Sequence, residues 1–246
     1  MKRHSLFKYY DDRKWAEAFL DGDLLFRSLA YYRDLEDNMV REDQKEGTSV
    51  FRPEGGLVVT NHTQGTTMTL EDCSFESTAA QQDIFVFCMS RSRADEVGRA
   101  FGASVCVEIH DIATLCARVT AALPSDARLP QMAGRSGQIG HRVTYYPAEE
   151  GGQPRWALPD LIAISKLEAY KWQDEFRLVF SLTGALDFEN VTTRLVHKAH
   201  PRDAARPLEH KTDLVKAGTL HDIARIRELA GPDTGESPGL RGKPGA

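Results

Sequence analysis

DIFVFCMS, residues 83–90, is a nearly continuous apolar run of strand length, and it decides the fold class. A strand that is apolar on both faces lies inside a sheet with cover on both sides, so we predict a central strand here. Alternating segments at residues 104–110 and 140–147 predict further strands. GLVVTNH and TTMTLED, joined through Gln64 and Gly65, predict a β-hairpin.

Two segments carry the start signals of short amphipathic helices. Over residues 11–22, Asp11 or Asp12 can cap the helix N-terminus. Over residues 111–123, Asp111 is the expected N-cap. Short helices among many strands predict an α+β fold, with a mixed or antiparallel central sheet and short flanking helices.

The chain divides by composition into three parts. Residues 1–196 contain most of the predicted strands and helices and are expected to form a single α+β domain. Residues 197–230 form a polar extension, in which apolar residues at helical spacing predict a terminal helix over 213–230. Residues 231–246 are rich in Gly and Pro and too poor in apolar side chains to bury a core, so they predict a disordered tail.

Composition excludes several classes of protein. The formal net charge of −5 lacks the basic excess of a typical nucleic-acid binder. No window reaches the roughly 18 apolar residues of a membrane span, and the N-terminus has no apolar stretch of a signal peptide. The cysteines form no C-x-x-C pair and are expected to be reduced core residues: Cys73, Cys88, Cys106 and Cys116. We therefore expect a cytoplasmic protein without a membrane partner.

WQDEFRLVF, residues 172–180, alternates polar and apolar side chains and predicts a strand, preceded by a shorter strand at 161–165. On such a strand Gln173 and Glu175 share one face. One interpretation is an edge strand with a polar outer face. The other is a carboxylate held in a cleft beside an amide, where it can accept a ribose hydroxyl and stabilise the cationic sugar carbon of glycosyl transfer.

Two serines follow the apolar run of the predicted central strand. Ser90 and Ser92 can be turn-forming residues at the end of that strand. Alternatively, their hydroxyls lie at the mouth of the strand and hold a neighbouring catalytic carboxylate in place.

The sequence has no H-E-x-x-H motif, no Cys/His cluster, no G-x-x-x-x-G-K-[ST] motif and no G-x-G-x-x-G between a strand and a helix. GRSGQIG, residues 134–140, is a flexible loop or a nucleotide cradle. An acidic segment between residues 33 and 46 offers a further alternative. Its carboxylates could converge on Mg²⁺ in a phosphodiesterase, or form a solvated helix with i,i+4 ion pairs. The residues that would serve a metal-dependent nuclease are Glu36, Asp37, Asp43 and Glu46.

The order of motifs resembles a broad set of poorly characterised bacterial and phage-linked proteins. The motifs are LFKYY, then FVFCMSRS, then FG-x-x-VCVEI, then YKWQDEFRLVF. Members of that set open with Leu-Tyr-Lys-Tyr and close with a Glu-x-Glu-aromatic-Arg strand. The layout is in turn similar to the ADP-ribosyltransferase superfamily, in which a late strand carries Gln-x-Glu or Glu-x-Glu. The resemblance implies an ADP-ribosyltransferase-like fold.

The resemblance also implies roles for individual residues. Glu175 matches the catalytic glutamate, and Gln173 matches its upstream partner that positions the acceptor. Ser90 matches the serine of the middle strand, with Ser92 beside it. The first-strand position falls at Lys8, where the superfamily has Arg or His. The residues implied to contact NAD are Lys8, Tyr9, Tyr32, Ser90 and Ser92.

Three hypotheses about function follow. The first is an ADP-ribosyltransferase-like enzyme that cleaves NAD as its substrate and transfers ADP-ribose to a protein, a nucleic acid or water, acting as a toxin or phage-defence effector. The second is a metal-dependent nuclease or phosphodiesterase that uses the acidic segment. The third is a non-catalytic module that binds a nucleotide in the same cleft.

Overall fold

The computed structural model describes residues 5–34, 45–93, 95–131, 137–151, 153–197 and 208–229. Its main sheet has eight strands: β1 (Leu6–Tyr10), β2 (Asp23–Ser28), β7 (Ile84–Ser90), β8 (Val105–Ile109), β9 (Gly140–Arg142), β12 (Glu175–Ser181), β14 (Thr212–Lys216) and β15 (Ala224–Glu228). Neighbouring strands in this sheet all pair antiparallel. The fold is therefore α+β, with an antiparallel central sheet, as the sequence predicts.

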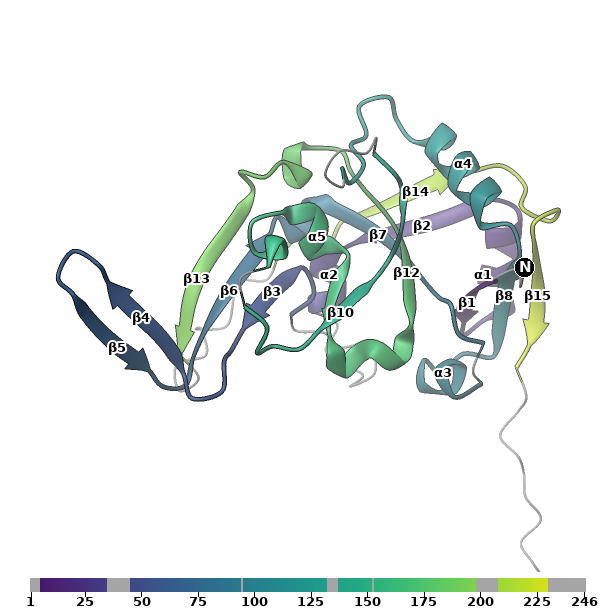
Figure 1. Ribbon diagram of the computed structural model, residues 1–246. Helices are drawn as coiled ribbons and strands as arrows, with labels where there is room; N and C mark the ends of the chain where they lie inside the picture. The colour runs from purple at the N-terminus through teal and green to yellow at the C-terminus, as the bar shows by residue number, and fades with distance from the viewer. Residues whose placement is uncertain are drawn as a thin grey trace, which may run out of the picture.

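β7 is the centre of this sheet, which confirms the predicted central strand (Figure 1). Along one edge it pairs with β12 over its whole length, and β12 continues to β9. Along the other edge it pairs with β2 near its start and with β1 at its end. The sheet therefore divides at β7 into two wings, one formed by β2 and β14 and the other by β1, β8 and β15.

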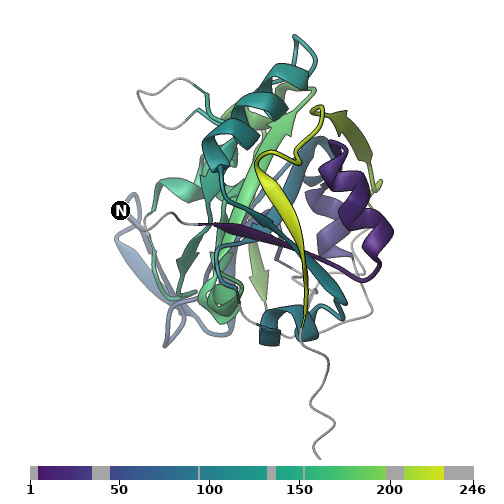
Figure 2. The ribbon, with the colours of Figure 1, turned by 90° about the vertical axis from the view of Figure 1, so that its right-hand side faces the viewer.

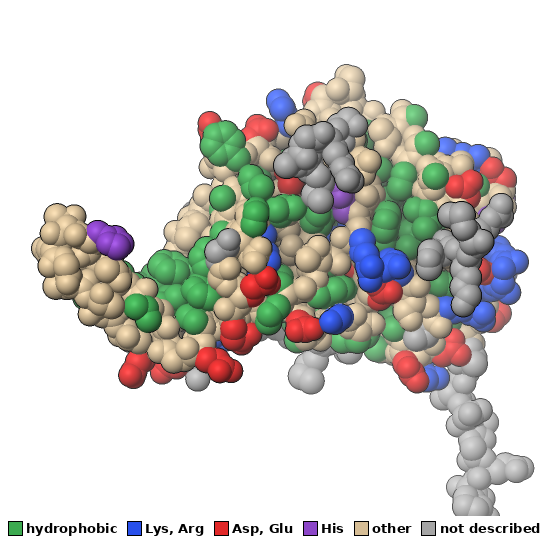
Figure 3. Space-filling view, viewed as in Figure 1, with side chains coloured by type: hydrophobic (Ala, Val, Ile, Leu, Met, Phe, Trp, Pro, Cys, Tyr) green, Lys and Arg blue, Asp and Glu red, His purple; other side chains and the backbone are tan. Residues whose placement is uncertain are grey.

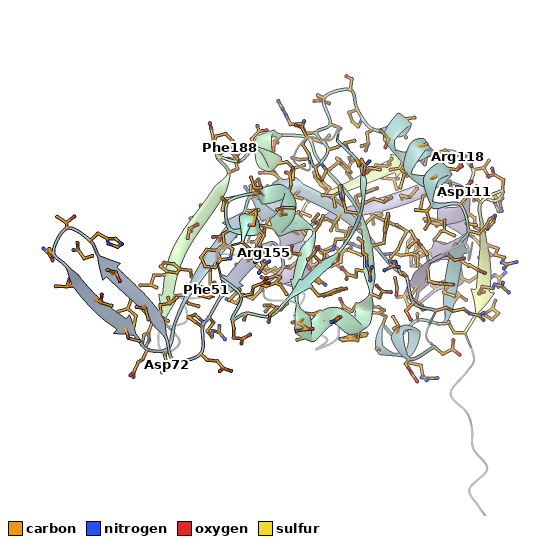
Figure 4. The ribbon with its side chains drawn as sticks, viewed as in Figure 1. Phe51, Asp72, Asp111, Arg118, Arg155 and Phe188 are labelled. Carbon is orange, nitrogen blue, oxygen red and sulfur yellow. The ribbon has the colours of Figure 1, made fainter. Side chains whose placement is uncertain are left out.

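In the described part of the chain, five short α-helices flank the sheet: α1 (Arg13–Leu20), α2 (Leu29–Arg33), α3 (Asp95–Ala100), α4 (Ile112–Ala122) and α5 (Pro159–Ala163). The 3-10 helices are Gln81–Asp83, Pro154–Trp156, Glu168–Gln173 and Gly184–Leu186. Asp12 caps α1 through the Lys14 amide, and Asp111 caps α4 through the Thr114 amide, so both predicted caps are confirmed. Figure 4 labels Asp111, which precedes α4, and Arg118 within α4, and Arg118 pairs with Asp222 at 2.6 Å.

Two hydrophobic cores lie on opposite faces of the β7–β12 pair. Phe87 and Phe180 face the first core, which α1 and α4 cover. Val86 and Val179 face the second core, which includes residues of α2 and α5. Because side chains alternate along a strand, Ser90 and Glu175 lie on the face of the second core. The cysteines are free thiols, as expected: Cys73, Cys88, Cys106 and Cys116.

A smaller sheet lies beside the main one, in the order β13 (Val191–His197), β6 (Cys73–Ala79) and β3 (Thr48–Phe51). Beyond it, β4 (Leu57–Asn61) and β5 (Thr66–Leu70) form the predicted hairpin, which turns at Gly65 with φ of 63°. This hairpin projects from the body, with mostly polar side chains toward its tip (Figures 1 and 3). β10 (Thr144–Tyr146) and β11 (Ser165–Leu167) form a parallel pair.

Two predicted strands near the candidate site are wrong in part. Residues 161–165 were expected to form a strand, but α5 covers residues 159–163 and β11 begins at Ser165. Pro159 at the first helical position has the fixed φ that favours this helix. The strand expected from Trp172 starts only at Glu175, because Asp174 is left-handed with φ of 39° and ends a 3-10 helix.

The predicted terminal helix is also wrong. Residues 213–230 instead supply β14, which pairs with β2, and β15, which pairs with β8 (Figure 2). Gly218 at φ of 71° breaks the helical run. The two wing edges offer unpaired backbone groups, and pairing with them outweighs the helical spacing of Leu220, Ile223 and Ile226. These residues thus extend the main sheet, while the tail at 231–246 lies outside the described residues.

Gly22→Ala is expected to lower the free energy of unfolding by more than about 2 kcal/mol. Gly22 has φ of 101°, and an added Cβ would lie 2.1 Å from the Gly218 carbonyl oxygen. Chemical denaturation measures the loss. Gly218→Ala is the control, since it has positive φ but open space around its Cβ, and it should cost only about 1 kcal/mol. Equal losses in the two variants would contradict the close approach.

Among the described residues, no helix is long and apolar enough to cross a membrane.

Candidate active site

Glu175 is the first residue of β12 and pairs directly with Ser90, the last residue of β7. The Ser90 hydroxyl donates to the Gln173 backbone carbonyl at 2.8 Å. The Glu175 amide donates to the Tyr145 hydroxyl at 2.9 Å. The left-handed Asp174 turns the chain between Gln173 and Glu175, so their proximity comes from this turn and not from strand alternation.

Lys166 of β11 joins the two residues that the sequence singled out. Its ammonium donates to Gln173 Oε1 at 3.0 Å and to Glu175 Oε1 at 3.1 Å. It also lies 3.3 Å from Glu46 Oε2. The Lys166 side chain is only 6% exposed, so these contacts are shielded from water. The structure therefore brings Gln173 and Glu175 together on one buried cation.

Arg177 holds the other side of the same carboxylate. Its Nε donates to Glu175 Oε2 at 2.8 Å. Its terminal nitrogens form a two-point ion pair with Glu46, at 2.7 and 2.9 Å, and one of them also donates to the Ala163 carbonyl at 2.7 Å. Arg177 is 1% exposed, and Glu46 is 2% exposed. A guanidinium with this set of partners is rigidly fixed.

The charges of this buried cluster balance. Glu46 and Glu175 supply two negative charges, and Lys166 and Arg177 supply two positive ones. Burial by itself raises the pKa of Glu175, but the charges of Arg177 and Lys166 outweigh it and lower the pKa to about 2. Glu175 is consequently an ionised carboxylate at neutral pH, in a site where water contributes little screening.

The ionisation of Glu175 makes stability depend on pH. Its pKa is lowered in the folded state from 4.5 to about 2, so the stabilisation is present above about pH 4.5 and is lost as the pH falls toward 2. That shift corresponds to about 3 kcal/mol. Denaturant unfolding at several pH values between 7 and 2 measures it. Glu175→Gln should show a flatter acid slope, and an unchanged slope would contradict the assignment.

Tyr32 of α2 lies at the edge of the second core near the same cluster. Burial raises the pKa of Tyr32 well above its usual range, and it lies within the electric field of Glu175 and Arg177. Cys88 pairs with Arg177 across β7 and β12, and burial raises the pKa of its thiol to about 11. Both groups are therefore neutral neighbours of the ionised carboxylate at pH 7.

Tyr9 and Ser92 lie next to Ser90. The Tyr9 hydroxyl donates to the Ser92 carbonyl at 3.0 Å, and the Ser90 hydroxyl contacts the same carbonyl at 3.2 Å. These bonds tie β1 to the segment after β7. The predicted group of Ser90, Ser92 and Tyr9 is thus contiguous with Glu175.

Lys8 does not join this group. Phe7 pairs with Ser90, so alternation places Lys8 on the opposite face of β1. Its ammonium donates to the Cys88 carbonyl at 2.8 Å and lies 4.4 Å from the centroid of the Phe87 ring, which belongs to the first core. The contact with NAD that the resemblance implied for Lys8 is therefore not supported by its position.

Sequence reasoning missed Lys166 and Arg177 and gave Glu46 a different role. Arg177 had a signal, since it lies two residues after Glu175 and shares its face on a strand. No pattern in the sequence indicates a role for Lys166 or Glu46 beside Glu175, because their contacts with Glu175 and Arg177 depend on tertiary structure alone.

The acidic segment gives little support to a metal site. Both carboxylate oxygens of Glu46 already bind Arg177. Glu36, Asp37 and Asp43 lie outside the described residues. Within the part of the chain that the structure describes, no group of three His, Cys, Asp or Glu side chains could hold a metal ion.

No protein-family model, no curated protein and no solved structure matches this chain.

Proposed function

We propose that this protein is an ADP-ribosyltransferase-like enzyme, which cleaves NAD and transfers ADP-ribose to an acceptor. The observation that carries the proposal is the ionised Glu175 at the start of β12, paired with Ser90 and joined to Gln173 through Lys166. The resemblance in motif order assigns Glu175 and Gln173 to catalysis and Ser90 to contact with NAD. Their meeting at one point of the central sheet supports the assignment.

In this proposal Glu175 acts by electrostatics. Its carboxylate accepts a hydrogen bond from a hydroxyl of the nicotinamide ribose and stabilises positive charge at the anomeric carbon. The bond from that carbon to the nicotinamide nitrogen breaks, and nicotinamide leaves with the bonding electron pair. The acceptor then bonds to the same carbon and loses a proton. Each Glu175 oxygen has a protein donor, and a carboxylate oxygen has a second lone pair for the substrate.

Further residues complete the proposed site. For stacking on the nicotinamide ring we propose Tyr32 and Tyr9, as the resemblance implies, and both side chains are half-buried. Ser92 lies beside Ser90. Gln173 is the group that we propose positions the acceptor, which is a protein, a nucleic acid or water. As the biological role we propose a toxin or phage-defence effector.

Nicotinamide release from NAD tests the proposal. The full chain is expected to release nicotinamide in the absence of any added acceptor, with water as the acceptor, and faster when cell lysate is present. A shift of the melting temperature with NAD but no release in either condition would favour the nucleotide-binding module instead. Absence of both signals would contradict NAD as the substrate.

A further inference from the structure

Of the four charged residues in the buried cluster, only Glu175 has a role in the proposed NAD chemistry. The contacts of Arg177 indicate a role for the others. Every nitrogen of its guanidinium donates a hydrogen bond, and the acceptors are Glu175 Oε2, both oxygens of Glu46 and the Ala163 carbonyl. With these partners and an exposure of only 1%, the guanidinium is not placed to bind a ligand. Arg177 therefore acts on the site through Glu175, by holding one of its oxygens in place.

Hydrogen bonds hold the backbone at Glu46 and Gly47 in place. Gln81 donates from its amide to the Glu46 backbone carbonyl and accepts from Arg33 at 2.7 Å. Gly47, the next residue, has a left-handed backbone with φ of 69°, and β3 begins directly after it. The Gly47 carbonyl accepts from the Ala79 amide at 3.1 Å, which joins this segment to β6. The backbone that carries Glu46 is thus joined to the edge of the small sheet, while its carboxylate reaches Arg177.

The balance of charges explains why the cluster contains Glu46. Arg177 alone beside Glu175 would leave Lys166 as an excess buried cation, and Glu46 supplies the charge that compensates it. Lys166 then bridges both carboxylates and Gln173. The four charged groups form one connected unit, in which Glu46 contacts Lys166 and Arg177 and both of these contact Glu175.

We infer that Arg177 and Glu46 are positioning residues for Glu175, so that the small sheet, through Glu46, sets the orientation of the carboxylate in the main sheet. This inference rests on the proposed function of Glu175. Lys166 completes the unit by tying Gln173 to the same carboxylate.

The test compares Arg177→Lys and Glu46→Gln with the wild-type chain. Arg177→Lys keeps the charge but loses the planar fork, and Glu46→Gln keeps the shape but loses the two-point ion pair. We expect both variants to lower kcat for nicotinamide release by up to about 100-fold, because displacing a catalytic group by about 1 Å has a cost of that order. We expect KM to change little. A loss of folding alone would lower the active fraction and could be corrected by active-site titration.

Glu108→Gln is the matched control. Glu108 of β8 also holds two arginines, Arg225 and Arg227, at 2.9 and 2.8 Å, and β1 and β7 separate β8 from β12. Its replacement should leave kcat unchanged. Wild-type kcat in either Arg177→Lys or Glu46→Gln would overturn the inference while leaving the proposed function intact.

A second readout keeps the inference testable if the wild-type chain does not release nicotinamide. The ¹³C resonance of the Glu175 carboxyl, assigned with Glu175→Gln, reports its contacts without any substrate. It should move in Arg177→Lys and Glu46→Gln and stay in place in Glu108→Gln. An unmoved resonance in the first two variants would overturn the inference.

Discussion

Replacing Arg177 with Met is expected to destabilise the protein by about 3–5 kcal/mol, because it leaves an uncompensated buried charge. The variant keeps two carboxylates, Glu46 and Glu175, with Lys166 as their one remaining cation in the cluster. Glu46 also loses both donors of its two-point ion pair. Urea or guanidinium unfolding at pH 7 measures the loss.

A double variant separates charge imbalance from lost packing. Arg177→Met combined with Glu46→Leu leaves one carboxylate and one ammonium, Glu175 and Lys166, and should recover part of the stability. Arg225→Met is the control for removing an arginine from an exposed ion pair, since Arg225 is 58% exposed, and it should cost less than about 1 kcal/mol. A double variant no more stable than Arg177→Met would contradict the balanced cluster.

Glu175→Gln is expected to lower nicotinamide release by about 100- to 1,000-fold, the range for losing one preorganised electrostatic group. The amide retains the shape of the side chain and an oxygen that can accept from Lys166. It carries no negative charge to stabilise the developing cation. The loss should therefore fall on kcat, because the interaction strengthens only as positive charge develops.

Stability must be measured beside this activity. Glu175→Gln leaves the cluster with one excess positive charge, so the melting temperature is expected to fall. The rate comparison is valid at a temperature where both proteins are folded, as shown by circular dichroism. A release rate within about threefold of wild type would exclude the electrostatic role of Glu175.

Local rules predicted much of the fold. The apolar run of β7, the Gly65 turn of the hairpin and the Asp12 and Asp111 caps each depend on neighbours within a few residues. These features need no knowledge of long-range contacts. The meeting of Glu175 with Ser90 is itself a long-range contact, and it was expected only from one interpretation of Ser90 and from the resemblance in motif order.

The wrong and missed predictions fall where contacts between residues far apart in the sequence determine the structure. Residues 213–230 have helical spacing but pair as β14 and β15 with wing edges that lie far away in sequence. Gln173 meets Glu175 through the left-handed Asp174 and the ammonium of Lys166, and not through strand alternation. Glu46 lies among surface-like charges in the sequence, yet its partner Arg177 is 131 residues away.

The most direct measurement is nicotinamide release from NAD by the wild-type chain, with Glu175→Gln and Glu108→Gln measured in parallel. We predict release by the wild type and by Glu108→Gln, and almost none by Glu175→Gln. Release by Glu175→Gln at the wild-type rate, or no release by any of the three proteins, would contradict the central claim that Glu175 is the catalytic carboxylate of an NAD-cleaving enzyme.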